Sequence, residues 1–227
     1  MHIEPGVVTG AKIALSYATA AGAFGLAAKM AHDTIQKDGG IASLALRSVP
    51  TTALVFFFFQ VLPHQPVGVS EVHLILGSTL FLIFGGGAAA IGLTLGLLLQ
   101  GLFFVPTDLP QYGMNVTTLL VPLYAMSLLA RKVIPARTAY KDVKYLQALA
   151  LSTSYQAGIV AWVAFWALYG QGLGAENLAR VASFGAAYMT VIIVEPLVDL
   201  AVLAVAKNLD RFKDSLLFHN RLYTPAA

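Results

Sequence analysis

Residues 72–105 form an apolar run without a single Asp, Glu, Lys or Arg, and this run constrains the fold more than any other feature. An α-helix rises 1.5 Å per residue, so about 20 residues cross the ~30 Å hydrocarbon core of a bilayer. The run is therefore too long for one crossing. The whole chain is similarly apolar: 58% of its residues are hydrophobic, only 11% are charged, and its mean hydropathy is +0.75. Soluble domains carry about 25% charged residues, so a membrane protein is predicted.

The best place for a turn within this run is Gly85-Gly86-Gly87, because consecutive glycines tolerate a tight reversal of the chain. We therefore expect two short membrane-spanning helices, one on each side of these glycines. Five further apolar segments are each predicted to span the membrane once: residues 9–30, 42–61, 115–136, 146–170 and 179–206. The expected fold is an all-α integral membrane protein with seven transmembrane helices, in which residues 1–227 form one transmembrane domain.

The distribution of basic residues favours this topology. If the N-terminus is outside, only Lys12 and Arg180 of the 14 Lys and Arg residues fall on the outer side, which leaves 12 inside. Cytoplasmic loops carry an excess of Lys and Arg, so the C-terminus is expected in the cytoplasm. Merging residues 72–105 into one span would move the cluster from Arg131 to Lys144 outside, against this rule. The basic residues thus follow membrane sidedness, and we expect contact with membrane lipid and no nucleic-acid partner.

The chain contains no cysteine, which excludes disulfides, thiolate metal ligands and a cysteine nucleophile. It also lacks a phosphate-binding Walker motif, a Gly-x-Ser-x-Gly elbow and a His-Glu-x-x-His zinc helix. It is therefore not expected to be an enzyme, to contain catalytic residues or to hydrolyse ATP by itself. The functions left open by the residues alone are a stand-alone metal channel or secondary transporter, and a binding subunit for a metal or a vitamin.

The first residues, Met1-His2-Ile3, can chelate a metal ion. The terminal amine and the His2 amide nitrogen would close one ring, and that amide nitrogen and the nearer imidazole nitrogen would close a second. Three nitrogens in one plane suit square-planar nickel(II) or copper(II), and low-spin cobalt(II) less readily. Cleavage of a signal peptide at Ala21-Gly22-Ala23 would remove this site, but no basic residue precedes Lys12, as a signal peptide would require. A Met-His start also occurs by chance.

Polar groups from other segments are expected at the same membrane face. His73 is predicted at the outer mouth of the third span, where its imidazole can supply a fourth nitrogen. Asn115 is predicted at the outer mouth of the fifth span, where it can orient a ligand histidine or the N-terminal segment. The alternatives are an interfacial His73 bonded to a carbonyl group and an Asn115 that caps a helix. The remaining histidines are expected to be solvated or at the surface: His32, His64 and His219.

Ionisable residues also occur deep within predicted spans. Glu195 and Asp199 lie one helical turn apart on the seventh span, and Arg47 on the second span lies at a depth similar to that of Asp199. The simplest interpretation is a structural ion pair between Arg47 and Asp199. The alternative makes Glu195 a station on an inward metal path or a coupling switch, because intramembrane charges are commonly functional.

Small residues recur at four-residue spacing along the first span. They form two stripes, Ala14-Ala18-Gly22 and Ala23-Ala27-Ala31. Such stripes let helices approach closely, so they can either dock a partner subunit or pack the bundle internally.

The chain resembles the CbiM/NikM family, the substrate-binding membrane (S) components of energy-coupling-factor cobalt and nickel transporters. The resemblance covers residues 1–126 and rests on four motifs: Met1-His2-Ile3-x-x-Gly6, His73-Leu74 with Gly77, Gln100, and Gly113-x-Asn115. The chain departs from the family before Gly6, where it has Glu4-Pro5 instead of Pro-Asp. It departs again before His73, where Ser70-Glu71-Val72 stands in place of Gly-Thr-Ser-Gly.

The resemblance implies a protein of the bacterial cytoplasmic (inner) membrane with seven spans and an external N-terminus. It implies that Met1 and His2 supply three nitrogen ligands and His73 the fourth, with Asn115 and Gln100 as orienting residues. The ligand would be divalent cobalt or nickel as the transported substrate, without an organic cofactor. The implied partners are a coupling transmembrane (T) subunit, a pair of ABC ATPases and a small accessory membrane subunit.

Overall fold

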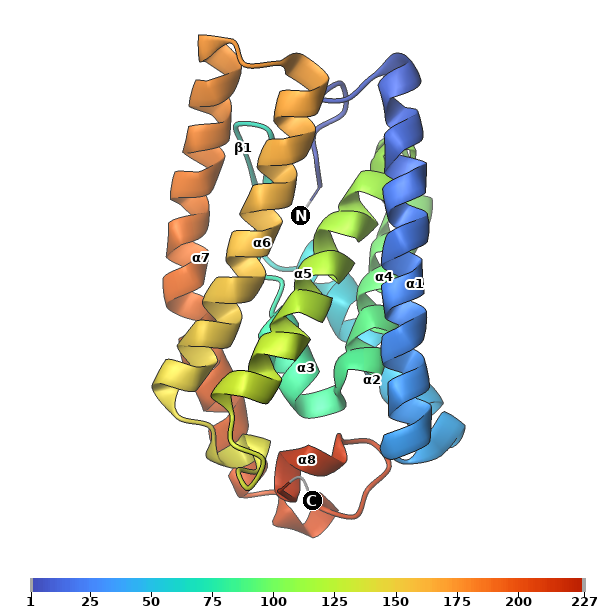
Figure 1. The fold of residues 1–227 in the computed structure, drawn as a ribbon, viewed down its shortest axis with the longest axis vertical. Coiled ribbons are helices and arrows are strands. Elements are labelled where there is room, and N and C mark those ends of the chain that lie inside the picture. Colours follow the sequence, from blue (N-terminus) through green and yellow to red (C-terminus); the bar gives the residue numbers. More distant parts are fainter. Residues whose placement is uncertain (1, 226–227) are drawn as a thin grey trace.

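The computed structural model describes residues 2–225, and most of them are helical (Figure 1). The long helices are α1 (Ala14–Lys37), α2 (Gly40–Gln60), α4 (Gly86–Phe103), α5 (Tyr112–Val133), α6 (Tyr145–Gln171) and α7 (Ala175–Lys207). The short elements are α3 (Gly77–Phe84), α8 (Asn220–Tyr223), β1 (Gln65–Val67), β2 (Ser70–Val72) and the 3₁₀ helices η1 (Gly10–Ile13), η2 (Pro106–Gln111), η3 (Tyr140–Asp142) and η4 (Asp210–Phe212). Each of the five apolar segments predicted as a single span coincides with one long helix.

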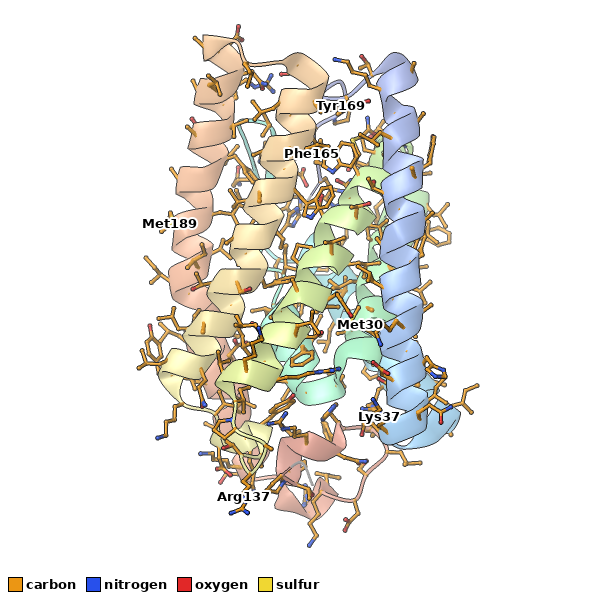
Figure 2. The ribbon with its side chains drawn as sticks, viewed as in Figure 1. Met30, Lys37, Arg137, Phe165, Tyr169 and Met189 are labelled. Atoms are coloured by element: carbon orange, nitrogen blue, oxygen red, sulfur yellow. The ribbon has the colours of Figure 1, made fainter. Side chains whose placement is uncertain are left out.

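Six helices among the described residues are long and apolar enough to cross a membrane, with η1 continuing into α1 and η2 into α5. A helix bonds its own backbone N–H and C=O groups, which the water-free bilayer interior requires. Large apolar side chains of α7 face outward: Met189, Ile193 and Leu197 are each more than half exposed. Figure 2 shows Met189 pointing away from the bundle. Such a surface is stable where lipid covers it, so the chain is a multi-pass membrane protein.

The charge-free run at residues 72–105 breaks at Gly85, inside the predicted glycine turn. Gly85 has φ 84°, a left-handed conformation that favours glycine, and it separates α3 from α4. Two spanning helices were expected here, but only α4 is long enough, because α3 has 8 residues and a length of about 12 Å. The rest of that passage is non-helical chain at residues 73–76. The seven-span topology and the outer position of the N-terminus stay predictions.

The short helix α3 is enclosed by the other helices. It contacts α2, α4, α5, α6 and α7, and its residues from Gly77 to Ile83 are all buried. Non-helical backbone at membrane depth is tolerated only where protein surrounds it, and this packing provides such an environment for the segment that leads into α3. Burial by protein is a tertiary property, which is why the sequence did not predict the short α3 and the non-helical segment before it.

The two ends of the bundle differ in content. Figure 1 shows the β1–β2 hairpin and the segment preceding α1 in the upper half, whereas α8 lies at the lower end. Lys37 and Arg137 also lie at the lower end (Figure 2). Between these ends, α5 packs between α1 and α6, and α4 packs against α1 and α2. The upper half therefore brings together the N-terminal segment, the hairpin and the start of α5.

Candidate metal centre

The N-terminal segment adds to the hairpin like a third strand. The β1 and β2 strands pair antiparallel, with Gly68 in their turn at φ 64°. The backbone N–H of Glu71 donates to the His2 carbonyl at 2.9 Å, and the N–H of Glu4 donates to the Val69 carbonyl at 3.2 Å. These bonds fix the start of the chain against β2. His2 is thereby held beside the residues that immediately precede His73.

Asn115 anchors the same segment from α5. Its Oδ1 accepts a hydrogen bond from the Ile3 N–H at 3.0 Å, and both residues are buried. Asn115 lies within the first turn of α5, whose preceding residue Gln111 makes no side-chain cap bond. Of the roles considered from the sequence, the geometry corresponds to the one that orients the N-terminal segment.

The imidazoles of His2 and His73 meet inside the upper half of the bundle. Their ring centroids are 5.5 Å apart, and the residues are 2% and 1% exposed. The ring of Phe59, near the end of α2, packs on both imidazoles at 5.9 and 5.4 Å. Two of the predicted ligand residues, 71 positions apart (73 − 2) in the sequence, are therefore brought together. Met1, the third predicted member of the ligand set, lies outside the described residues.

Two carboxylates accompany the histidines, and sequence reasoning did not single out either of them as a site residue. Glu71 Oε2 lies 2.9 Å from His73 Nε2 in a hydrogen bond, and Asp108 Oδ2 lies 2.9 Å from His2 Nδ1. Donor atoms of His2, Glu71 and His73 lie within 4.8 Å of one another, close enough to share one metal ion. Glu71 could have been found from its position, because residues two apart on a strand point to the same face. Asp108 carries no comparable local signal.

Burial sets the protonation of the two histidines. It lowers the pKa of His2 and lowers that of His73, so both imidazoles are neutral near pH 7. Among the described residues, His2 Nε2 and His73 Nδ1 are buried and have no hydrogen-bond partner. Burial, reinforced by the nearby charges of Glu71 and Asp108, raises the pKa of Glu4. Neutral imidazoles with carboxylates beside them form a site that favours a divalent cation.

Two further residues touch this site at its edge. The His64 ring stacks on His73 with a centroid distance of 4.9 Å, and His64 is half-buried. The expectation of a solvated His64 is therefore wrong, because the loop between α2 and β1 folds back over the site.

Gln100 donates from Nε2 to the Phe59 carbonyl at 3.1 Å and to Gln60 Oε1 at 3.2 Å. Gln100 thus contacts the end of α2 rather than an imidazole.

The model of one protein family, described as the cobalt uptake substrate-specific transmembrane region CbiM, matches residues 2–211. The chain belongs to the CbiM family. Two crystal structures resemble its fold, each at 18% sequence identity. One, of a truncated transition metal transporter, gives a TM-score of 0.62 and covers 93% of this chain and 99% of that chain. The other, of a transition metal transporter, gives 0.60 and covers 93% and 94%.

A comparison with curated proteins finds no match. Membership of the CbiM family confirms the resemblance inferred from the Met-His start and the later motifs. It places the chain in membrane transport of a metal.

In this CbiM-family chain, Glu195 supports the segment that follows His73. Its Oε1 accepts hydrogen bonds from the backbone N–H groups of Ile75 and Leu76 at 3.0 and 2.9 Å. Its Oε2 accepts from Gln156 Nε2 at 2.6 Å and from Ser152 Oγ at 3.3 Å. Leu76 has φ 53°, a strained conformation for a leucine, so the segment needs this support. Glu195 therefore holds the entry to α3 in place.

The predicted ion pair between Arg47 and Asp199 is wrong. Arg47 Nη1 pairs with Asp38 Oδ2 at 2.6 Å and also donates to the Phe84 carbonyl at 2.9 Å. Asp199 instead accepts hydrogen bonds from Thr79 Oγ1 and, at 2.8 Å, from Ser78 Oγ. The reason is α3, which contacts both α2 and α7 and supplies hydroxyl groups to Asp199. His219, expected at the surface, lies 3.5 Å from Asp38 and is only partly exposed.

Proposed function

We propose that this chain is the substrate-binding membrane subunit of an ATP-driven energy-coupling-factor importer for divalent cobalt or nickel. The metal is held by the terminal amine of Met1, by the amide and imidazole nitrogens of His2, and by His73. The observation that carries the proposal is the convergence of two buried, neutral histidines, each with a ring nitrogen that has no hydrogen-bond partner within residues 2–225. Imidazole donors suit nickel and cobalt, and the absence of cysteine argues against a site for copper(I).

The orientation in this proposal places the metal centre toward the outside and α8 in the cytoplasm. Lys37 and Arg137 at the lower end support it, because basic residues accumulate on the cytoplasmic side (Figure 2). The basic segment from Arg131 to Tyr145 would lie along anionic lipid at that face. The site would then capture metal from the outer side, and coupling to partners would release it inward.

The partners in this proposal are a coupling transmembrane subunit, a pair of ATPases and a small accessory membrane subunit. The chain has no Walker motif, so energy must come from another subunit. The two small-residue stripes of α1 differ in burial: Ala14, Ala18 and Gly22 are exposed, whereas Ala23 is buried and Ala27 and Ala31 are half-buried. The exposed stripe is the proposed docking surface, and the other stripe packs within the bundle.

Adding a short segment of several Gly and Ser residues before Met1 tests the proposed chelate. The added segment converts the Met1 amine into an amide nitrogen and carries the free amine away from His2, so the first chelate ring is lost. A single added residue would not serve, because Xaa-Met-His itself offers an amine, two amide nitrogens and an imidazole to nickel. We expect nickel and cobalt affinity to fall by roughly a hundredfold, the contribution of one ligand in a four-ligand metal site. The measurement is metal content and dissociation constant of the purified full chain. A chain that carries the same added segment at the C-terminus is the matched control, and tight binding by the N-terminally extended chain would contradict the chelate.

Substituting Gly170 tests whether the position of the N-terminal segment matters. A Cβ atom at residue 170 would lie 1.9 Å from the Val7 carbonyl oxygen, so Gly170→Ala must push the segment away from α6. We expect nickel affinity to fall by about tenfold or more because His2 is displaced. Gly174→Ala is the control, since nothing lies within 4 Å of a Cβ there and its φ is −60°. Equal affinities for the two variants would count against the role of this segment.

A further inference from the structure

Glu71 is tied to both histidines of the candidate metal centre. It lies in the middle of β2, and its backbone N–H donates to the His2 carbonyl at 2.9 Å. Its side-chain Oε2 is hydrogen-bonded to His73 Nε2, also at 2.9 Å. Glu71 therefore fixes the start of the chain through its backbone and faces the second imidazole with its carboxylate.

The side chains of these three residues converge on one point. Donor atoms of His2, Glu71 and His73 lie within 4.8 Å of one another. Within residues 2–225, this is the one place where three His, Cys, Asp or Glu side chains meet in this way. Two atoms bound to one metal at about 2.0–2.1 Å lie up to about 4 Å apart. Small side-chain rotations are thus enough to bring all three donors onto one ion.

The surroundings of this group suit a captured ion. The two imidazoles are buried under the Phe59 ring, and His2 Nε2 and His73 Nδ1 have no hydrogen-bond partner in the described part of the chain. Buried polar atoms are normally bonded, so these nitrogens call for a ligand. The Glu71 side chain is 26% exposed, so its carboxylate is the member of the group that an ion from solvent meets first.

We propose that Glu71 is a metal ligand, so that one carboxylate oxygen joins the imidazoles of His2 and His73 in holding the transported divalent metal. This inference deepens the proposed function and rests on its two histidines, but it does not require the Met1 amine. Two imidazoles and one carboxylate form a donor set that divalent transition metals accept. The carboxylate also cancels one of the two positive charges, which lowers the cost of burying the ion.

The alternative role for Glu71 is to orient His73 through their hydrogen bond. That bond does not decide between the two roles, because a carboxylate that only positions an imidazole makes the same contact. Glutamine separates them, because its amide oxygen can still accept the bond but is neutral and a poorer metal ligand. A ligand role therefore predicts that Glu71→Gln is nearly as damaging as Glu71→Ala. A positioning role predicts that Glu71→Gln retains most of the affinity.

The experiment uses the full chain with its native N-terminus and cobalt(II) chloride as the probe. Wild type, Glu71→Gln and Glu71→Ala are compared for the cobalt dissociation constant. They are also compared by infrared difference spectra of loaded and unloaded protein, because a carboxylate that binds a metal changes its stretching frequencies. We expect both variants to lose about a hundredfold in affinity, the contribution of one ligand, and to lose the carboxylate band.

Glu4→Gln is the matched control for the lost charge. Glu4 lies in the N-terminal segment, and its charge interacts with that of Glu71, but its carboxylate is outside the converging group. We expect the control to lose less than about fivefold in cobalt affinity, the value of a weak charge pair. A loss in Glu4→Gln as large as that in Glu71→Gln would mean that charge alone explains the effect and would overturn the ligand role.

The outcomes separate this inference from the proposed function. If wild type binds cobalt tightly and Glu71→Gln keeps that affinity, Glu71 is not a ligand, whereas the proposed function stands. The substitution is repeated in the chain with the added segment before Met1. If that segment leaves binding intact but Glu71→Gln still weakens it, the amine chelate fails and the three-residue set is supported. If wild type binds neither cobalt nor nickel, both proposals fail.

Discussion

Replacing His73 by alanine is expected to weaken nickel and cobalt binding by roughly a hundred- to thousandfold. Four-ligand structural metal sites release about 10–16 kcal/mol on binding, so each ligand accounts for about 3 kcal/mol. His73 is buried, and its Nδ1 has no hydrogen-bond partner among the described residues, so this nitrogen is available to bind a metal. His2→Ala is expected to reduce affinity at least as much, since it opens the second chelate ring. The measurement is competition against a chromophoric chelator.

Two histidine variants provide the controls for this prediction. His32→Ala removes an exposed imidazole on α1 and is expected to leave affinity unchanged. His64→Ala removes only a ring stacked on His73, and the loss should stay below about tenfold, the value of an aromatic contact. Thermal unfolding of each variant shows whether the fold is retained. If folded His73→Ala protein bound nickel as tightly as wild type, His73 would not be a ligand.

Replacing Glu195 by alanine is expected to destabilise the protein and to weaken metal binding together. The substitution leaves the N–H groups of Ile75 and Leu76 buried without an acceptor, at about 1–3 kcal/mol each. A total of about 3 kcal/mol corresponds to a fall in unfolding temperature of about 6–12 °C for a chain of this size. Because Ile75 and Leu76 follow His73 closely, affinity for nickel should fall as well.

Glu195→Gln separates the structural role from a role in transport. The amide keeps one acceptor oxygen but presents N–H groups toward Gln156 or toward the backbone donors, so a smaller loss of stability is expected. If Glu195 only supports the loop, uptake by the assembled transporter should fall in proportion to binding. Normal binding with lost uptake would instead make Glu195 a coupling switch. Glu176→Gln, exposed at the start of the same helix, is the control for a changed charge.

The helices could be predicted from the sequence because each membrane segment must satisfy its own backbone hydrogen bonds. Each long apolar run therefore implies a helix. Gly85 implies a break in the helical chain. His2 and His73 were likewise identified from short motifs. Both predictions depend on residues close together in the chain, and the long helices and the break occur where they were expected.

Contacts between distant segments could not be predicted in the same way. Asp199 was the wrong prediction for the partner of Arg47, because α3 lies between α2 and α7. The depth of two residues along their helices does not show what lies between those helices. His64 was placed in solvent because its loop has two prolines, but the loop folds over His73. Asp108 reaches His2 from a short helix 106 positions away (108 − 2), and no local pattern marks that contact.

The sequence by itself determined that this chain crosses a membrane repeatedly, where its helices run, and which histidines merit attention. These properties follow from hydrophobicity and from backbone hydrogen bonding within single segments. Only the tertiary structure decided that α3 is half-length, that Asn115 holds Ile3, and that Glu71 and Asp108 stand beside the imidazoles. Those features depend on how the extended segments are enclosed by other helices, and that enclosure is a property of the packed bundle as a whole.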